Sequence, residues 1–196
     1  MKTLNLTAEI EKLVGNIVSR VPALNHIDPS RVLVCVASTR GGGIHGTYAK
    51  IHPLRFPGGG STMEKWRGSK RTVYSMPKVT HRGMDMLYII YFLVPRFLNL
   101  TVREKLITIF HELYHVSPEM DGDIRRFPGK NYAHGSSRKR YNALMAHLVE
   151  GYLRDLEDEN LVRFLEGDMD AIRSRYRVIV GRRFPVPCIQ MENCEG

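Results

Sequence analysis

The segment His111-Glu112-Leu113-Tyr114-His115 has the residue types and the spacing best suited to chemistry. On a helix, residues four apart leave the same face one turn apart, so both imidazoles can bind one metal ion. A Glu that follows the first histidine reaches metal-bound water rather than the metal. The segment therefore predicts a hydrolytic metal site, with His111 and His115 as ligands and Glu112 as the general base.

Zinc is the metal that this donor set favours. Two neutral imidazoles and one further N or O donor make an open tetrahedral site and leave a fourth position for water. The metal lowers the pKa of that water, Glu112 takes its proton, and the hydroxide attacks a carbonyl polarised by the same ion. We therefore expect Zn2+ as the cofactor and amide hydrolysis as the reaction.

The third ligand is expected downstream of this helix, and His134 is favoured. Gly135 permits a close backbone approach, and Ser136 or Ser137 can cap the following helix, so His134 lies on a loop beside a helix start. Its side chain can then reach a shared site without occupying the helix core. The main alternatives to His134 as third ligand are Asp121, Asp123 and Glu150, and the remaining candidates are Glu119 and His147.

The helix that carries the two histidines has a clear start and end. Thr101 precedes an apolar periodic run, and Glu104 lies three residues later, so each side chain can satisfy the other's free backbone donor. Pro118 disfavours helical geometry in the residue before it. We predict a helix from Thr101 through Val116.

The surrounding pattern predicts an α+β fold, in which a small sheet packs on the histidine-bearing helix. The continuously apolar segment Met86–Val94 predicts a central strand. The Val-rich segment Arg31–Ala37 predicts a second buried strand. Thr72–Val79 predicts an edge strand, because Pro77 interrupts it. Helices are expected at Thr7–Val21, Ser136–Leu156 and Glu159–Leu165, and a late strand is expected within Arg175–Phe184.

Length and composition predict one domain over residues 1–196, with residues 185–196 as a tail. The longest apolar run, Leu87–Val94, is less than half of the ~20 residues that span a bilayer. Charged residues within Met1–Arg20 do not fit a secretory signal, so we expect a cytoplasmic protein without a membrane partner. Three cysteines suggest no disulfide framework.

Several of these features together resemble the SprT-like zinc metallopeptidases, the group that includes Spartan. The shared features are the strand at 86–94, the His-Glu-x-x-His helix, a variable loop, and His134-Gly135 opening a helix with Tyr141. The chain is also similar to metallopeptidases found in phage and bacterial genomes. The resemblance implies a zincin-type, SprT-like fold. It also implies a peptidase with His111, His115 and His134 as zinc ligands and Glu112 as the catalytic residue.

The net charge of +9 indicates a polyanion as a second possible partner. Basic residues gather in three stretches, and aromatic residues near them can stack on bases. One interpretation of these stretches is contact with nucleic acid, with DNA-associated proteins as substrates. The alternative is a solvated basic surface in which Arg125 and Arg126 pair with Asp121 or Asp123. The stretches are Lys65, Arg67, Lys70, Arg71, Lys78 and Arg82; Arg125, Arg126, Lys130, Arg138, Lys139 and Arg140; and Arg173, Arg175, Arg177, Arg182 and Arg183, with Trp66, Tyr74 and Tyr132 as the aromatic residues.

The alternative function is a noncatalytic protein that binds nucleic acid or uses the metal structurally. Such a protein would keep its fold and its partner when Glu112 is changed. A structural metal site has no need of a Glu between its histidines, so the sequence favours the enzyme. The oligomeric state is not predicted.

Overall fold

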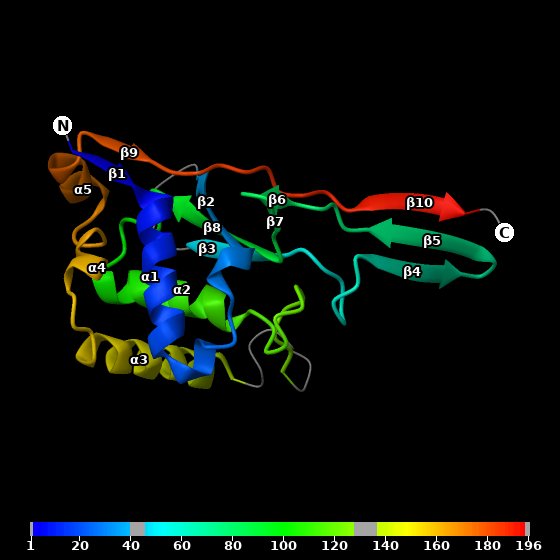
Figure 1. Ribbon diagram of the computed structural model, residues 1–196, viewed down its shortest axis with the longest axis horizontal. Helices are drawn as coiled ribbons and strands as arrows, with labels where there is room; N and C mark the ends of the chain where they lie inside the picture. Colours follow the sequence, from blue (N-terminus) through cyan, green and yellow to red (C-terminus); the bar gives the residue numbers. More distant parts are fainter. Residues whose placement is uncertain (1, 40–45, 128–136, 195–196) are drawn as a thin grey trace.

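The computed structural model describes residues 2–39, 46–127 and 137–194. Helices pack on one side of a three-stranded sheet, and a second three-stranded sheet projects from this body (Figure 1). The fold is therefore α+β, as the sequence predicted. The helices are α1 (Leu6–Arg20), α2 (Val102–Tyr114), α3 (Arg138–Arg154), α4 (Asn160–Arg163) and α5 (Met169–Arg175).

The strands of the described ranges form small sheets. The central sheet has the order β2 (Val32–Ser38), β8 (Tyr88–Val94), β3 (Ala49–Pro53). The projecting sheet, here called the arm, has the order β10 (Gln190–Cys194), β5 (Lys70–Ser75), β4 (Thr62–Arg67). Two short pairs complete the set, β1 (Thr3–Asn5) with β9 (Val178–Val180) and β6 (Thr80–His81) with β7 (Met84–Asp85).

Both faces of the central sheet are largely buried, which explains why β2 and β8 are apolar along most of their length. β2 runs parallel to β8, and β3 runs antiparallel along the other edge of β8. Val34, Ile90 and Ile51 are register partners and pack in the main core with the helices. Their neighbours Leu33 and Ile89 face a second buried cluster on the opposite side. The helices therefore cover only one face of the sheet.

The helix layer holds α2 in place. α1 begins where the side chain of Asn5 accepts a hydrogen bond from the backbone N–H of Ala8, and it buries Ile10, Leu13 and Ile17 completely. α1 packs on β2, while α2 contacts β3 on one side and α3 on the other. None of the helices in the described ranges combines the length and apolar character that a bilayer-spanning helix needs.

The arm differs most from the sequence prediction. The predicted edge strand Thr72–Val79 is in fact β5, the middle strand of the arm, which ends at Ser75 before Pro77. Within the predicted tail at residues 185–196, residues 190–194 form β10, which pairs antiparallel with β5. Both differences arise because partners distant in the sequence supply the backbone hydrogen bonds of these strands.

The segment after β9 covers the outer edge of β2. The backbone N–H of Val36 donates to the carbonyl oxygen of Arg182 at 2.8 Å. The backbone N–H of Arg182 in turn donates to the hydroxyl of Thr7 on α1 at 3.1 Å. An exposed strand edge invites pairing with other chains, so this contact protects one edge of the central sheet.

Candidate active site

α2 begins with a complete capping box. The hydroxyl of Thr101 accepts from the backbone N–H of Glu104, and the Glu104 carboxylate accepts from the backbone N–H of Thr101 at 2.9 Å. The apolar side of the helix, which includes Ile109 and Leu113, is buried in the main core. The predicted helix start is therefore confirmed, and this packing fixes the direction in which the remaining face points.

His111 and His115 converge at the C-terminal end of α2. Their Nε2 atoms are 3.1 Å apart and their ring centroids 4.7 Å apart. His115 is buried and His111 is half-buried. A tetrahedral zinc ion with Zn–N bonds of about 2.0–2.1 Å would hold two nitrogens about 3.3 Å apart. The separation of the two histidines thus fits a shared metal ion.

Glu112 lies between the two histidines in the sequence and is only 6% exposed. Burial raises the pKa of its carboxyl group to about 7, while a hydrogen bond from the backbone of Ile51 in β3 acts in the opposite direction. A carboxylate with a pKa near neutrality can both accept and release a proton. Its environment therefore suits a general base.

Tyr141 of α3 completes the surroundings of the histidine pair. Its ring stacks on His115 with centroids 5.9 Å apart, and it meets His111 edge-on at 5.0 Å. Its hydroxyl donates to the carbonyl oxygen of His111 at 3.4 Å. The sequence placed Tyr141 on the next helix but gave no sign of these contacts, because they depend on how α3 packs against α2.

The loop after α2 is tied to the end of that helix. The backbone N–H of Arg125 donates to the His115 carbonyl at 2.7 Å, and its side chain donates to the Tyr114 carbonyl at 2.9 Å. Arg126 forms two hydrogen bonds with the Asp123 carboxylate, both at 3.0 Å. Pairing of Arg126 with Asp123 was one of the alternatives that the sequence left open. These contacts restrict the position of His115.

Tyr88 of β8 fastens the same loop to the central sheet. Its buried hydroxyl donates to the carbonyl oxygen of Asp123 at 2.7 Å and accepts from the backbone N–H of Gly122 at 3.0 Å. Gly122 has a φ of +90°, and a side chain there would collide with Arg55. The glycine therefore permits the close approach that joins the loop to the sheet.

Among the described residues, no third His, Cys, Asp or Glu forms a metal-binding group with His111 and His115. His134, the favoured ligand, lies outside the described residues and stays a prediction. The rival carboxylates are engaged elsewhere. Asp123 binds Arg126, Asp121 accepts from the backbone N–H of Asp123 at 3.0 Å, and the exposed Glu150 pairs with Arg103.

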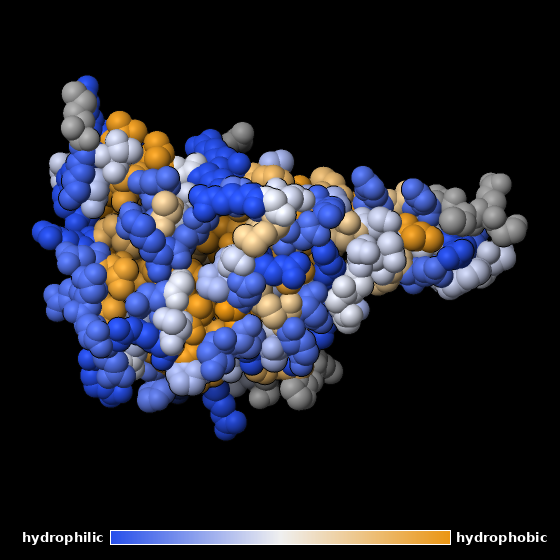
Figure 2. Space-filling view, in the orientation of Figure 1, coloured by the Kyte–Doolittle hydropathy of each residue, from blue (hydrophilic) through white to orange (hydrophobic). Residues whose placement is uncertain are grey.

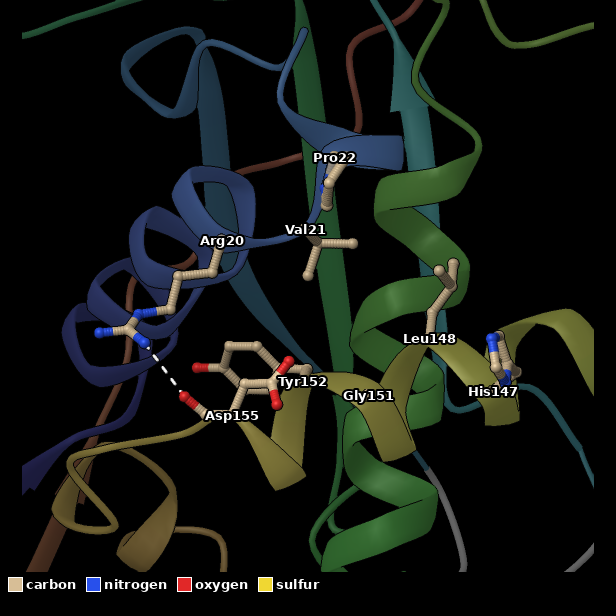
Figure 3. Close-up of a pocket in the computed structure, with 8 residues that line it drawn as sticks. All are labelled: Arg20, Val21, Pro22, His147, Leu148, Gly151, Tyr152 and Asp155. Carbon is tan, nitrogen blue, oxygen red and sulfur yellow. Dashed lines mark hydrogen bonds between the residues drawn. The ribbon is translucent and has the colours of Figure 1, made fainter.

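His147, another downstream candidate, lines a surface pocket of about 300 Å³ between α1 and α3 (Figure 3). Arg20 and Tyr152 line the same pocket, where Arg20 donates to the carbonyl oxygen of Asp155 at 3.1 Å. His147 follows Tyr141 by six residues, so it lies about 240° around α3 from the residue that meets the histidine pair. This pocket is therefore separate from the candidate metal site.

Most of the chain matches the model of a protein family. The family model described as "Putative phage metallopeptidase" matches residues 3–157. The matched stretch runs from β1 to just beyond α3 and includes the segment from His111 to His115. Comparisons with curated proteins and with solved structures gave no match.

Proposed function

Because the chain belongs to the putative phage metallopeptidase family, we propose that it is a zinc-dependent peptidase of the zincin type. His111, His115 and His134 hold the metal, and Glu112 is the general base. The observation that carries this proposal is the convergence of two imidazole nitrogens, 3.1 Å apart, beside a buried carboxylate on one helix end. A structural site would gain nothing from burying that carboxylate, which costs free energy.

The chain's own groups divide the chemistry among them. Bound zinc would polarise the scissile carbonyl and lower the pKa of water. The Glu112 carboxylate takes the proton of the attacking water and delivers it to the leaving amine, a role that its buried position beside the two histidines allows. Tyr141 and Arg125 act as positioning residues, because they contact the rings and the backbone of the two histidines.

The edge of β3 supports a peptide as the substrate. Ile51 lies between two hydrogen-bonded pairs of the β3–β8 ladder, so its backbone N–H points away from β8 and towards Glu112. Among the described residues, β3 pairs only with β8. An extended peptide that adds to this edge would lie beside the general base. DNA-associated proteins are one class of substrate that the basic surface favours.

The proposal is tested by metal analysis paired with a proteolysis assay. Purified protein should contain one zinc ion per chain and should cleave an unfolded protein or a peptide library, with DNA added in parallel reactions. Stoichiometric zinc without hydrolysis of unfolded, peptide or DNA-bound substrates would instead support the noncatalytic alternative. In that case, the metal would stabilise the fold and nucleic-acid binding would be the activity.

A further inference from the structure

The arm has two chemically different faces, which follow from its strand register. In an antiparallel sheet, directly paired residues project on the same side. β4 and β5 are joined by the two-residue turn Gly68-Ser69. Next to this turn Arg67 pairs with Lys70, and two residues further along β4 Lys65 pairs with Thr72. Further along, Met63 pairs with Tyr74, which also pairs with Met191 of β10. One face thus carries Met63, Lys65, Arg67, Lys70, Thr72, Tyr74 and Met191, and it is called the basic face here.

The basic face concentrates positive charge. Lys65, Arg67 and Lys70 are all exposed, and none of them forms an ion pair within the described part of the chain. The ammonium group of Lys65 lies 5.4 Å from the centre of the Tyr74 ring, which keeps this cation over the face. Arg67 and Lys70 are directly opposite each other, an arrangement of like charges that destabilises a sheet.

The opposite face of the same arm is balanced. It carries Glu64 and Glu192 with Arg71, and Arg71 forms an ion pair with Glu64. Trp66, the chain's single tryptophan, also projects on this side and is 65% exposed. Both faces carry exposed residues, so exposure alone does not explain the segregation of charge.

Elsewhere in the described chain, some cations of the three basic stretches have acidic partners. Lys78 pairs with Asp85, Arg126 with Asp123, Arg175 with Glu166 and Arg182 with Glu11. These pairs account for cations in each of the three stretches. The three cations of the basic face, which come from the first stretch, form no ion pair within the described chain and also lie together on one face of one sheet.

We propose that the basic face of the arm binds the phosphate backbone of nucleic acid. Lys65 and Arg67 are about 6.6–6.8 Å apart along β4. Lys70 lies on β5 across from Arg67, so the three cations are neighbours on one face of the arm. The arm itself is a narrow projection from the body (Figure 2). Nearby phosphates would relieve the repulsion between Arg67 and Lys70. Binding through phosphates predicts little dependence on base sequence.

Charge complementarity identifies the partner. A net charge of +9 favours an extended polyanion, and the face presents long cationic side chains rather than an apolar pocket for a protein anchor. The inference does not rest on the proposed peptidase activity, because the arm would bind phosphates whether or not Glu112 acts as a base. A failure of either proposal therefore leaves the other one open to its own test.

The first test measures salt-dependent binding of fluorescently labelled single-stranded and duplex DNA. Combining Lys65→Ala, Arg67→Ala and Lys70→Ala should flatten the plot of log affinity against log salt by about 2.7 for duplex DNA. Between about 50 and about 200 mM salt, the wild-type protein should then lose about 40-fold more affinity than the variant. The matched control combines Lys12→Ala, Arg154→Ala and Arg163→Ala, which removes the same charge from exposed positions on the body.

The outcomes of this test separate the possibilities. The inference holds if the control keeps the wild-type slope and the arm variant does not. It is wrong if both variants lose the same affinity, since overall charge would then be the cause. It is also wrong if wild-type protein binds polyglutamate but neither form of DNA, because the face would then meet an acidic protein surface. Unchanged thermal unfolding of both variants shows that their folds are intact.

A second test compares photo-crosslinking of bound DNA from each face of the arm, without removing any charge. A photo-crosslinking amino acid is placed at Thr72, which lies on the basic face, or at the adjacent Val73, which lies on the opposite face. With bound DNA, the substitution at Thr72 should give crosslinked complex and the one at Val73 should give several-fold less. Equal yields, or a higher yield at Val73, would overturn the assignment of the face.

Discussion

The backbone N–H of Arg125 donates to the carbonyl oxygen of His115 at 2.7 Å, so the loop that follows α2 is bound directly to the second histidine. The bridge between Val116 and Ile124 closes the same loop, and Asp123 is held by both Arg126 and Tyr88. The position of His115 therefore depends on residues outside its own helix.

Arg126→Ala is expected to destabilise the protein by about 1–2 kcal/mol, because it leaves the nearly buried Asp123 carboxylate without its guanidinium partner. Arg126→Lys should recover only part of this, since an ammonium group cannot form the same two-pronged contact. Urea unfolding measures both. Arg154→Ala, which breaks the exposed pair with Asp155, is the control and should cost less than about 0.5 kcal/mol. Equal losses at the two sites would contradict this role for Arg126.

Zinc content should depend on three histidines. His111→Ala, His115→Ala and His134→Ala should each abolish stoichiometric zinc, as measured by native mass spectrometry, because a tetrahedral site open to water needs all three protein ligands. Removing zinc from the wild-type protein with a chelator should lower its melting temperature, since a ligand of the native state stabilises that state. Asp121→Asn should keep its zinc. Loss of zinc in this variant, with retention in His134→Ala, would reassign the third ligand.

Local signals account for the parts of the fold that the sequence predicted well. The capping box at Thr101 and Glu104 lies within the first turn of α2, and the spacing of His111 and His115 spans about one turn at its C-terminal end. β2 and β8 are apolar along most of their length because both faces of the central sheet are buried. Each of these patterns can be recognised without knowing which distant segment it contacts.

Other elements depend on partners that the local sequence does not reveal. β3 contains Lys50, His52 and Pro53, so its strand signal is weak, and pairing with β8 makes it a strand. β10 likewise depends on β5. The β4–β5 hairpin did carry a signal, since Gly68-Ser69 is a two-residue turn of a recognised type and Gly68 has a φ of +63°. The sequence interpretation missed this turn.

Tyr141 should support the histidine pair mainly through its ring. Tyr141→Phe keeps the ring contacts with both histidines and should change zinc affinity little, whereas Tyr141→Ala should weaken zinc binding and cost about 3–5 kcal/mol of stability. Tyr152→Ala is the matched control, because Tyr152 is also buried on α3 but contacts Phe110 and Asn16. It should lose similar stability without losing zinc affinity. Equal loss of zinc affinity in both Ala variants would mean that Tyr141 acts only through the general packing of α3.

Lys105 of α2 should make stability depend on pH. Its side chain is fully buried, and its ammonium group donates to the carbonyl oxygen of Leu165 at 2.6 Å. Burial lowers the pKa of Lys105 from 10.5 to about 8. Because the unfolded chain then binds more protons between these values, this residue should raise the free energy of unfolding as pH rises from about 8 to about 10.

Urea unfolding at several pH values, compared with Lys105→Met, isolates this contribution. The stability difference between wild type and variant should change by on the order of 1 kcal/mol per pH unit in favour of the wild type. A difference that stays constant from neutral to alkaline pH would show that Lys105 keeps its proton throughout.

Glu112→Gln separates catalysis from metal binding. The amide keeps the size of the side chain but cannot act as a base, so hydrolysis should fall by at least ~10²-fold. Zinc should stay bound, because Glu112 is not a proposed ligand. The melting temperature should not fall, because the substitution removes a carboxylate whose charged form is disfavoured by burial.

Glu150→Gln is the control, because it makes the same chemical change at an exposed position that pairs with Arg103. This variant should keep both zinc and activity. DNA binding should be the same in both variants and in the wild type, since it depends on phosphate contacts. Wild-type activity in Glu112→Gln would exclude Glu112 as the base, whereas loss of zinc would show that its carboxylate belongs to the metal site.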